Sequence, residues 1–172
     1  TVLDNLLFSQ TSLLDCCHDP SFQFHRGDIC DWAVVKPLLD EHDVIIPLAA
    51  IVGAPACAKN PTLARLVNQD AHERIVNYTS REQRIIFPTT NSGYGVGEKD
   101  TYCTEESSLN PISEYGRMKV EIEKAFLDKG NAVTLRLATV FGMSPRMRMD
   151  LLVNDFVYKA MKERVIVLFE ES

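Results

Sequence analysis

Short apolar runs alternate along the chain with longer segments in which apolar residues recur at helical spacing. The runs predict strands, and "DVIIPLAA" is continuous enough for a strand buried on both faces. Asp31 is expected to cap the first helix, and Gly130 to end the third. The expected strands cover 1–4, 21–28, 43–50, 84–90 and 132–140, with 164–169 a candidate for a further short one. The expected helices cover 32–41, 62–80, 113–128 and 150–162.

This order of elements predicts an α/β fold. Strands that alternate with helices of about ten residues or more indicate a Rossmann-like, doubly wound parallel sheet. Sheets of this kind bind their ligands beyond the carboxyl ends of the strands. The residues that directly follow the strands are therefore the candidates for a site: Asp4, Asp28, Ala49, Ala50, 90–92 and 139–142.

Composition narrows the class of protein. The chain has 172 residues, 45% of them hydrophobic and 24% charged, which is typical of one soluble globular domain. A net charge of −6 argues against a nucleic-acid partner, because phosphate binding needs a basic face. There is no apolar run of about 18 residues, so no membrane span is expected.

The cysteines and histidines indicate neither a disulfide framework nor a metal site. The five cysteines form no C-x-x-C pair, and the first residues show no basic region followed by a long apolar one. Both observations favour reduced thiols and a cytoplasmic location. The four histidines are scattered, so they are expected on the surface or in loops, and no metal site is predicted.

Residues at the first three strand ends fit a dinucleotide. Asp4 can accept hydrogen bonds from both hydroxyls of an adenosine ribose and would repel a 2′-phosphate, which favours NAD over NADP. Asp28 can bond an adenine amino group, and the small residues of "PLAA" let a planar cofactor lie close to the backbone. The alternatives stay open, because aspartates also suit turns and small residues also suit tight packing.

Tyr115 and Lys119 carry the sharpest chemical signal. Positions i and i+4 share one helix face, about 6 Å apart. An ammonium at that distance stabilises a tyrosinate and lowers the pKa of the phenol from its ordinary value near 10. Tyr115 would then act as a general base on a sugar hydroxyl, and Thr90 at the preceding strand end would orient that hydroxyl. The plain alternative is an exposed tyrosine–lysine pair on an amphipathic helix.

The order of several motifs resembles the extended short-chain dehydrogenase/reductases, in the NAD-dependent epimerase/dehydratase branch that acts on nucleoside-diphosphate sugars. "VLDNL" is similar to the family's ribose-binding strand end, "GDICD" to its adenine-contacting motif, and "PLAAIVG" to the segment that lines the cofactor. Asn68 matches the asparagine of its "V-N" helix. "TTNSGYG", "PISEYGRMK" and "LRLATVFG" resemble the catalytic strand end, the Tyr–Lys helix and the strand that approaches the nicotinamide.

The resemblance implies roles residue by residue. The implied catalytic residues are Thr90, Tyr115 and Lys119. The implied NAD-binding residues are Asp4, Asn5, Asp28, Ile29, Leu48, Ala49, Ala50, Asn68, Tyr115, Lys119 and Val140. The implied residues for the nucleoside-diphosphate sugar are Asn91, Ser92, Thr139, Arg146, Arg148 and Asn154. Arg146 and Arg148 would pair with phosphate oxygens, although a solvated basic turn explains them equally well. Family members often dimerise through the helices expected here at 62–80 and 113–128, which implies a homodimer.

Departures from the family pattern favour one reaction. The 4,6-dehydratases of the family carry an Asp-Glu pair where this chain has Asn91 and Ser92. Asn and Ser do not perform general acid–base work at neutral pH. The sequence therefore favours an epimerase, with a reductase or dehydrogenase that makes a net redox change, or a non-catalytic nucleotide-binding scaffold, as the alternatives.

The glycine-rich fingerprint that the family uses for the cofactor phosphates is absent from this sequence. The expectation is a partial NAD(P)-binding Rossmann domain over 1–172, without the first strand and its glycine loop and largely without the carboxyl-terminal substrate domain. The strands around Val2 and Ile45 would then share no neighbour. Such a chain is expected to bind NAD poorly and to turn over no substrate by itself.

Overall fold

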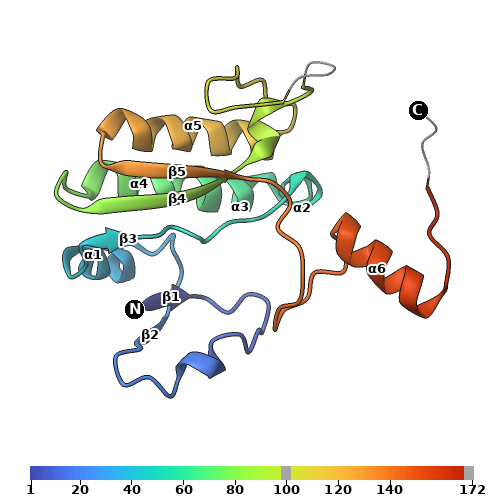
Figure 1. Ribbon diagram of the computed structural model, residues 1–172. Coiled ribbons are helices and arrows are strands. Elements are labelled where there is room, and N and C mark those ends of the chain that lie inside the picture. Colours follow the sequence, from blue (N-terminus) through green and yellow to red (C-terminus); the bar gives the residue numbers. More distant parts are fainter. Residues whose placement is uncertain (98–101, 169–172) are drawn as a thin grey trace. The chain divides into compact units, whose positions relative to one another are not determined.

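A computed structural model describes residues 1–97 and 102–168 of the chain. The chain divides into two compact units. The larger unit comprises Thr1–Asn5 and Phe24–Ala138, and the smaller unit comprises Leu6–Gln23 and Thr139–Ser172. Figure 1 shows the elements of both units along the chain.

All strands of the larger unit run parallel. A three-stranded sheet has the order β3 (Val44–Ile45), β4 (Arg84–Thr90) and β5 (Ala132–Leu137). A separate two-stranded sheet pairs β1 (Val2–Asp4) with β2 (Phe24–Arg26). Within the described residues, β1 and β3 are not neighbours in either sheet. The predicted Rossmann-like α/β fold with parallel sheets is confirmed.

Helices of the larger unit cover one face of the three-stranded sheet (Figure 1). The inward side chains of β4, Ile85 and Phe87, are fully buried, and the Phe87 ring packs at 5.0 Å from that of Phe126. Burying one such large apolar side chain contributes about 1.5–3 kcal/mol. The main core cluster consists of Val35, Leu39, Ile75, Ile85, Phe87, Ile122 and Phe126. The helices that supply it are α1 (Trp32–Asp40), α4 (Ala71–Tyr78) and α5 (Glu114–Lys129).

The end signals of two helices act as expected. The Asp31 carboxylate accepts a hydrogen bond from the Ala33 N–H at 3.1 Å, which caps α1. Gly130 ends α5 in the left-handed conformation, with φ of 84°, and its N–H bonds the carbonyl of Leu127. Glycine adopts this conformation without the steric cost that other residues meet.

The helix expected over 62–80 is present but is not one continuous α-helix. It consists of α3 (Pro61–Arg65), a π-helical turn η2 (Leu66–Asp70) and α4. Within this turn the Ala71 N–H bonds the carbonyl of Leu66, five residues back instead of four. Turns of this kind occur often at functional sites.

Several expected strand boundaries are wrong. β3 ends at Ile45, because Pro47 has no N–H to donate to a strand ladder. A helix that the sequence did not predict, α2 (Ala54–Lys59), follows the loop after β3. β5 ends at Leu137, and 164–168 contains no strand, while Phe169 lies outside the described residues.

Two further short turns complete the larger and smaller units. A 3-10 turn, η3 (Asn91–Tyr94), directly follows β4 in the segment expected to be loop. The described part of the smaller unit contains a 3-10 turn, η1 (Leu14–Cys16), and the α-helix α6 (Leu152–Lys162). None of the helices within the described ranges is long and apolar enough to cross a membrane.

Candidate active site

Thr90 lies at the carboxyl end of β4, where the strand turns into η3. Its hydroxyl oxygen accepts a hydrogen bond from the Ser92 N–H at 3.1 Å and lies 3.1 Å from the Ser92 hydroxyl. Thr90 therefore caps η3 and shares one turn with Asn91 and Ser92, whose side chains are exposed. The three residues predicted from this strand end are brought together.

The first turn of α5 packs against this strand end. The Ser113 hydroxyl accepts a hydrogen bond from the Gly116 N–H at 3.1 Å and caps the helix. A Cβ atom on Gly116 would lie 3.3 Å from the carbonyl oxygen of Ser92 and 3.0 Å from Pro111. The glycine therefore permits a close approach that carries Tyr115 toward the Thr90 turn.

Tyr115 is half-buried beside a small apolar cluster of the larger unit. The cluster is formed by Cys57, Ala64 and Met118, with Ile51 and Tyr115 packed against it. This contact fixes one side of the phenol ring with residues from α2, α3 and the loop after β3.

Lys119 is buried one helical turn after Tyr115, with only 5% of its surface exposed. Its Nζ donates a hydrogen bond to the carbonyl oxygen of Pro88 at 2.9 Å and lies 4.1 Å from the centroid of the Phe87 ring. Burial lowers the pKa of this ammonium to about 8, partly opposed by the carboxylate of Glu123. Lys119 therefore exchanges its proton close to physiological pH.

A buried ion pair next to Lys119 was not predicted from the sequence. Glu123 Oε1 accepts a hydrogen bond from Arg136 Nε at 2.7 Å, and the Thr134 hydroxyl lies 3.2 Å from the same oxygen. Arg136 Nη1 also donates to the Tyr94 hydroxyl at 3.2 Å and to the carbonyl of Glu105 at 3.1 Å. The guanidinium therefore ties α5, β5 and η3 together. The available signal was Glu123 itself, four residues after Lys119 on the same helix face.

Asn68 holds the loop that follows β3. Its Oδ1 accepts a hydrogen bond from the Ile51 N–H at 2.8 Å, and its Nδ2 donates to the Ile51 carbonyl at 2.9 Å. Nδ2 also lies 3.6 Å from the Cys57 sulfur. Asn68 is 1% exposed, so a buried amide fixes this loop through both of its hydrogen bonds to Ile51. Leu48 and Ala49 are exposed on the loop and Ala50 is half-buried.

Four of the predicted cofactor residues meet at the carboxyl end of the β1–β2 sheet. Asp4 pairs with Arg26 in the strand register, and its carbonyl accepts a hydrogen bond from the Gly27 N–H at 3.2 Å. Asn5 Nδ2 donates to Asp28 Oδ2 at 3.0 Å, and Asp28 Oδ1 accepts from the Cys30 N–H at 2.8 Å. These two hydrogen bonds lower the pKa of Asp28, the Cys30 N–H contributing most. Ile29 follows and packs against the main core.

The smaller unit contains the remaining predicted residues, and it is described by itself. Arg146 lies with its guanidinium carbon 3.4 Å from the centroid of the Phe8 ring, and Arg148 donates two hydrogen bonds to the Asp150 carboxylate at 3.1 and 2.5 Å. Asn154 is buried; its Oδ1 accepts from the Gly142 N–H at 3.0 Å, and its Nδ2 donates to the Arg148 carbonyl at 2.8 Å. The side-chain amide therefore holds the loop 142–148. Thr139 and Val140 are exposed.

One histidine contradicts the expectation of surface or loop positions. His72 lies on α4 and is 1% exposed, because its helix face packs on β4. Its Nδ1 lies 2.9 Å from the carbonyl oxygen of Val67, and its ring meets the Phe87 ring edge-on at 5.5 Å. Among the described residues, no group of His, Cys, Asp and Glu side chains could hold a metal ion.

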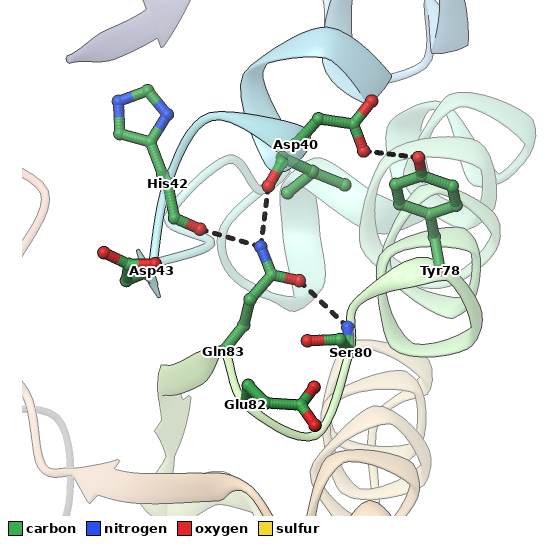
Figure 2. A pocket seen from close by; sticks show the side chains of 8 residues that line it. Asp40, His42, Asp43, Tyr78, Ser80, Glu82 and Gln83 are labelled. Atoms are coloured by element: carbon green, nitrogen blue, oxygen red, sulfur yellow. Dashed lines mark hydrogen bonds between the residues drawn. The ribbon is translucent and has the colours of Figure 1, made fainter.

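A hollow of about 440 Å³ lies at the opposite end of the three-stranded sheet, before β3 and β4 begin (Figure 2). Gln83 is at its centre, with Nε2 donating to the carbonyls of Leu39 at 2.6 Å and His42 at 2.7 Å, and Oε1 accepting from the Ser80 N–H at 2.9 Å. The Gln83 amide thus caps the end of α1. This hollow lies at the amino ends of β3 and β4, whereas Thr90 lies at the carboxyl end of β4.

Comparisons with known proteins agree with the Rossmann-like α/β fold. Residues 2–171 match the model of the NAD dependent epimerase/dehydratase family, so the chain belongs to that family. A probable low-salt glycan biosynthesis reductase of Haloferax volcanii is 36% identical over 130 residues, which cover 72% of this chain and 43% of the relative. A UDP-glucose 4-epimerase of Lactobacillus helveticus is 29% identical over 141 residues, covering 73% of this chain and 41% of the relative.

A solved structure supports the same assignment. The UDP-glucose 4-epimerase of Brucella ovis in complex with NAD is 25% identical, with a TM-score of 0.62 over 74% of this chain and 41% of that one. The chain spans less than half the length of the two curated relatives. The expected cofactor, NAD, is confirmed as that of the family.

The residues present fit NAD at the β1–β2 edge. The lowered pKa keeps Asp28 ionised, and Asp4 and Asp28 come together at one strand end, where carboxylates can accept hydrogen bonds from a ribose and an adenine. Lys119 has three donors as an ammonium, of which the Pro88 carbonyl takes one.

Proposed function

We propose that this chain carries the acid–base site of an NAD-dependent epimerase that acts on nucleoside-diphosphate sugars. The observation that carries the proposal is the joint placement of Thr90, Tyr115 and Lys119. Lys119 is buried under the helix turn that presents Tyr115, and the first turn of that helix lies against the Thr90–Ser92 turn. A helix with a merely solvated polar face would leave its lysine exposed.

The roles follow from the environment of each group. The Lys119 ammonium, one helical turn from Tyr115, favours the tyrosinate, so that the Tyr115 oxygen takes the proton of a substrate hydroxyl and returns it later. Thr90 orients that hydroxyl from the end of β4. Bound NAD supplies the acceptor and donor of hydride.

The residues that would hold NAD form three groups. Asp4, Asn5, Asp28 and Ile29 suit the adenosine half. Leu48, Ala49 and Ala50 suit the flat face of the cofactor, on a loop that Asn68 positions from behind. Tyr115 and Lys119 suit the nicotinamide half, and for Val140 the same assignment rests on the family resemblance alone.

The substrate side is a further part of the proposal. Asn91 and Ser92 follow Thr90 with exposed side chains and suit a sugar ring. Neither is an acid, which supports epimerisation over the loss of water. Thr139, Arg146, Arg148 and Asn154 suit the nucleoside diphosphate. Of the two arginines, Arg148 already binds the Asp150 carboxylate, whereas the Arg146 guanidinium lies over a ring.

A tyrosine variant tests the acid–base assignment in a protein that contains this chain and turns over a nucleoside-diphosphate sugar with NAD. Tyr115→Phe keeps the ring in its apolar cluster and removes the proton carrier, so turnover is expected to fall at least about 100-fold. Tyr102→Phe is the control, because Tyr102 is 97% exposed. Full turnover by Tyr115→Phe would remove the assignment.

A reductase is the second candidate, because the Haloferax volcanii relative is described as a probable reductase. Product analysis separates the two activities. An epimerase converts the sugar into its epimer with no net change in NADH absorbance, whereas a reductase consumes one NADH for each product molecule. Net NADH consumption would replace the proposed epimerase with the reductase.

A further inference from the structure

His72 is a buried titratable group that the proposed reaction does not use. The Val67 carbonyl can only accept a hydrogen bond, so His72 Nδ1 carries the proton of the neutral ring. His72 Nε2 then presents a lone pair, and it has no hydrogen-bond partner among the described residues. Burial, and next the charge of Lys119, lower the pKa of His72 to about 4. The ring is therefore neutral at the pH where Lys119 exchanges its proton.

His72 and Lys119 rest on the same aromatic ring. Phe87 is fully buried on β4. The centroids of the His72 and Phe87 rings lie 5.5 Å apart in an edge-on contact. The Lys119 Nζ lies 4.1 Å from the centroid of the Phe87 ring. The ring supplies a face for the ammonium, in a cation–π contact that is strong when water is excluded. His72, on α4, contacts the same ring. We call Phe87, Lys119 and His72 together the Phe87 layer.

The charged groups around this layer leave His72 without an acidic partner. On α5, Glu123 binds Arg136 of β5 at 2.7 Å, and Glu121 lies at the surface with Gln69 at 3.0 Å. On η2, Asp70 lies 3.6 Å from Arg65. A protonated His72 would therefore add a positive charge beside Lys119 that none of these carboxylates neutralises.

We propose that the neutral imidazole of His72 is a positioning residue for Lys119, which it supports through Phe87, and that protonation of His72 withdraws this support. The importance of Lys119 for turnover rests on the proposed function, whereas its coupling to His72 does not. The coupling is a property of the folded chain that can be measured without any substrate.

Nuclear magnetic resonance of the full chain with labelled lysine Cε and histidine ring positions measures this coupling. His72→Ala opens the layer to water and is expected to raise the pKa of Lys119 by about one unit or more. His72→Gln keeps a neutral donor for the Val67 carbonyl and is expected to leave the pKa of Lys119 near the wild-type value. His42→Ala is the matched control, since His42 also bonds a carbonyl through Nδ1, that of Leu38 at 2.7 Å, but lies in the turn after α1.

The wild-type chain provides a second measurement if His72→Ala does not fold. The Lys119 resonance should show an additional inflection at the acidic pH at which the His72 ring titrates. This inflection should be absent from His72→Gln and present in the His42→Ala control. A wild-type Lys119 resonance with no inflection there, or a folded His72→Ala variant with the wild-type pKa at Lys119, would overturn the proposal. A protein that shows the inflection while its Tyr115→Phe variant keeps full turnover would contradict the proposed function alone.

Discussion

At the scale of single residues, Lys119 shows that a buried cation can cost stability. Its pKa is lowered to about 8, whereas that of an unfolded lysine is 10.5, because burial disfavours the charged form. Below pH 8 the amine is charged in both states, so the folded state bears the full cost. Between pH 8 and 10.5 the folded amine is neutral while the unfolded one is charged, so the free energy of unfolding rises with pH through that window.

Lys119→Met is therefore expected to abolish turnover and to stabilise the fold. The gain should be about 1–3 kcal/mol at pH 7 and should shrink as the pH rises from 8 to 10.5. Urea unfolding at several pH values measures it. Lys124→Met, an exposed position on the same helix, serves as the control and should change stability little. A Lys119→Met variant that is less stable than wild type at pH 7 would show that the Phe87 and Pro88 contacts outweigh the cost of burial.

At the residue level, the motifs predicted which side chains to examine, and their catalytic roles stay predictions. Thr90, Tyr115 and Lys119 were found from their spacing and order, and the structure brings their elements together. The roles of His72 and Glu123 were missed, because burial of a polar side chain depends on partners distant in sequence. Glu123, for example, meets Arg136 only when α5 packs on β5.

At the scale of elements, the Glu123–Arg136 pair links α5 to the three-stranded sheet. The side chains are 2% and 16% exposed, respectively. Removal of one partner from a buried pair leaves an uncompensated charge and costs about 3–5 kcal/mol. Arg136 has the further function of holding Tyr94 beside the Thr90 turn.

Arg136→Met is expected to destabilise the fold by about 3–5 kcal/mol, and Glu123→Met combined with it is expected to recover at least half of that loss. Urea unfolding of the two single variants and the double variant measures the coupling. Arg117→Met removes an exposed pair with Glu114 on the same helix and should cost less than about 1 kcal/mol. If Arg136→Met and Arg117→Met lowered the free energy of unfolding equally, the buried pair would stabilise the fold no more than the exposed pair does.

Element boundaries followed from sequence only where a local signal existed. Asp31 and Gly130 marked helix ends correctly, since each acts through its own backbone neighbours. Hydrophobic runs overestimated β3 and β5, because apolar residues in a connection also look like a strand. The division of the helix over 62–80 has no signature in its apolar spacing.

At the scale of the whole molecule, the two parallel sheets differ in the number of strand neighbours and in the packing that stabilises them. β4 pairs with a strand on each side, and its buried side chains pack against α1, α4 and α5. Within the described residues, β1 and β2 pair only with each other. A two-stranded pair is marginally stable without additional packing. Leu3 gives the β1–β2 sheet one such contact with the main core.

Hydrogen exchange of the 172-residue chain should reveal this difference. The Gly27 N–H bonds the Asp4 carbonyl at 3.2 Å in the small sheet, and the Ile85 N–H bonds the Asn131 carbonyl at 3.1 Å in the larger one. The Ile85 amide is expected to exchange at least about tenfold more slowly, equivalent to about 1.4 kcal/mol of additional opening free energy. Equal protection of the two amides would indicate that both sheets open as one cooperative body.

The fold class was the most predictable property of the molecule. Strand and helix alternation is encoded repeatedly along the chain, so errors in single boundaries did not affect it. The strands around Val2 and Ile45 were expected to share no neighbour, and within the described residues they lie in separate sheets.

The π-helical turn at Leu66–Asp70 makes helix length, and not only residue identity, a requirement of this protein. Asn68 within the turn and His72 just beyond it have separate targets, the Ile51 loop and the Phe87 layer. The π-helical turn already holds one residue more than an α-helical turn, so insertion of a further residue, such as an alanine after Gln69, would rotate everything after it by about 100°. His72 would leave the core while every other side chain stayed the same. This segment should therefore accept many surface substitutions but no additional residue.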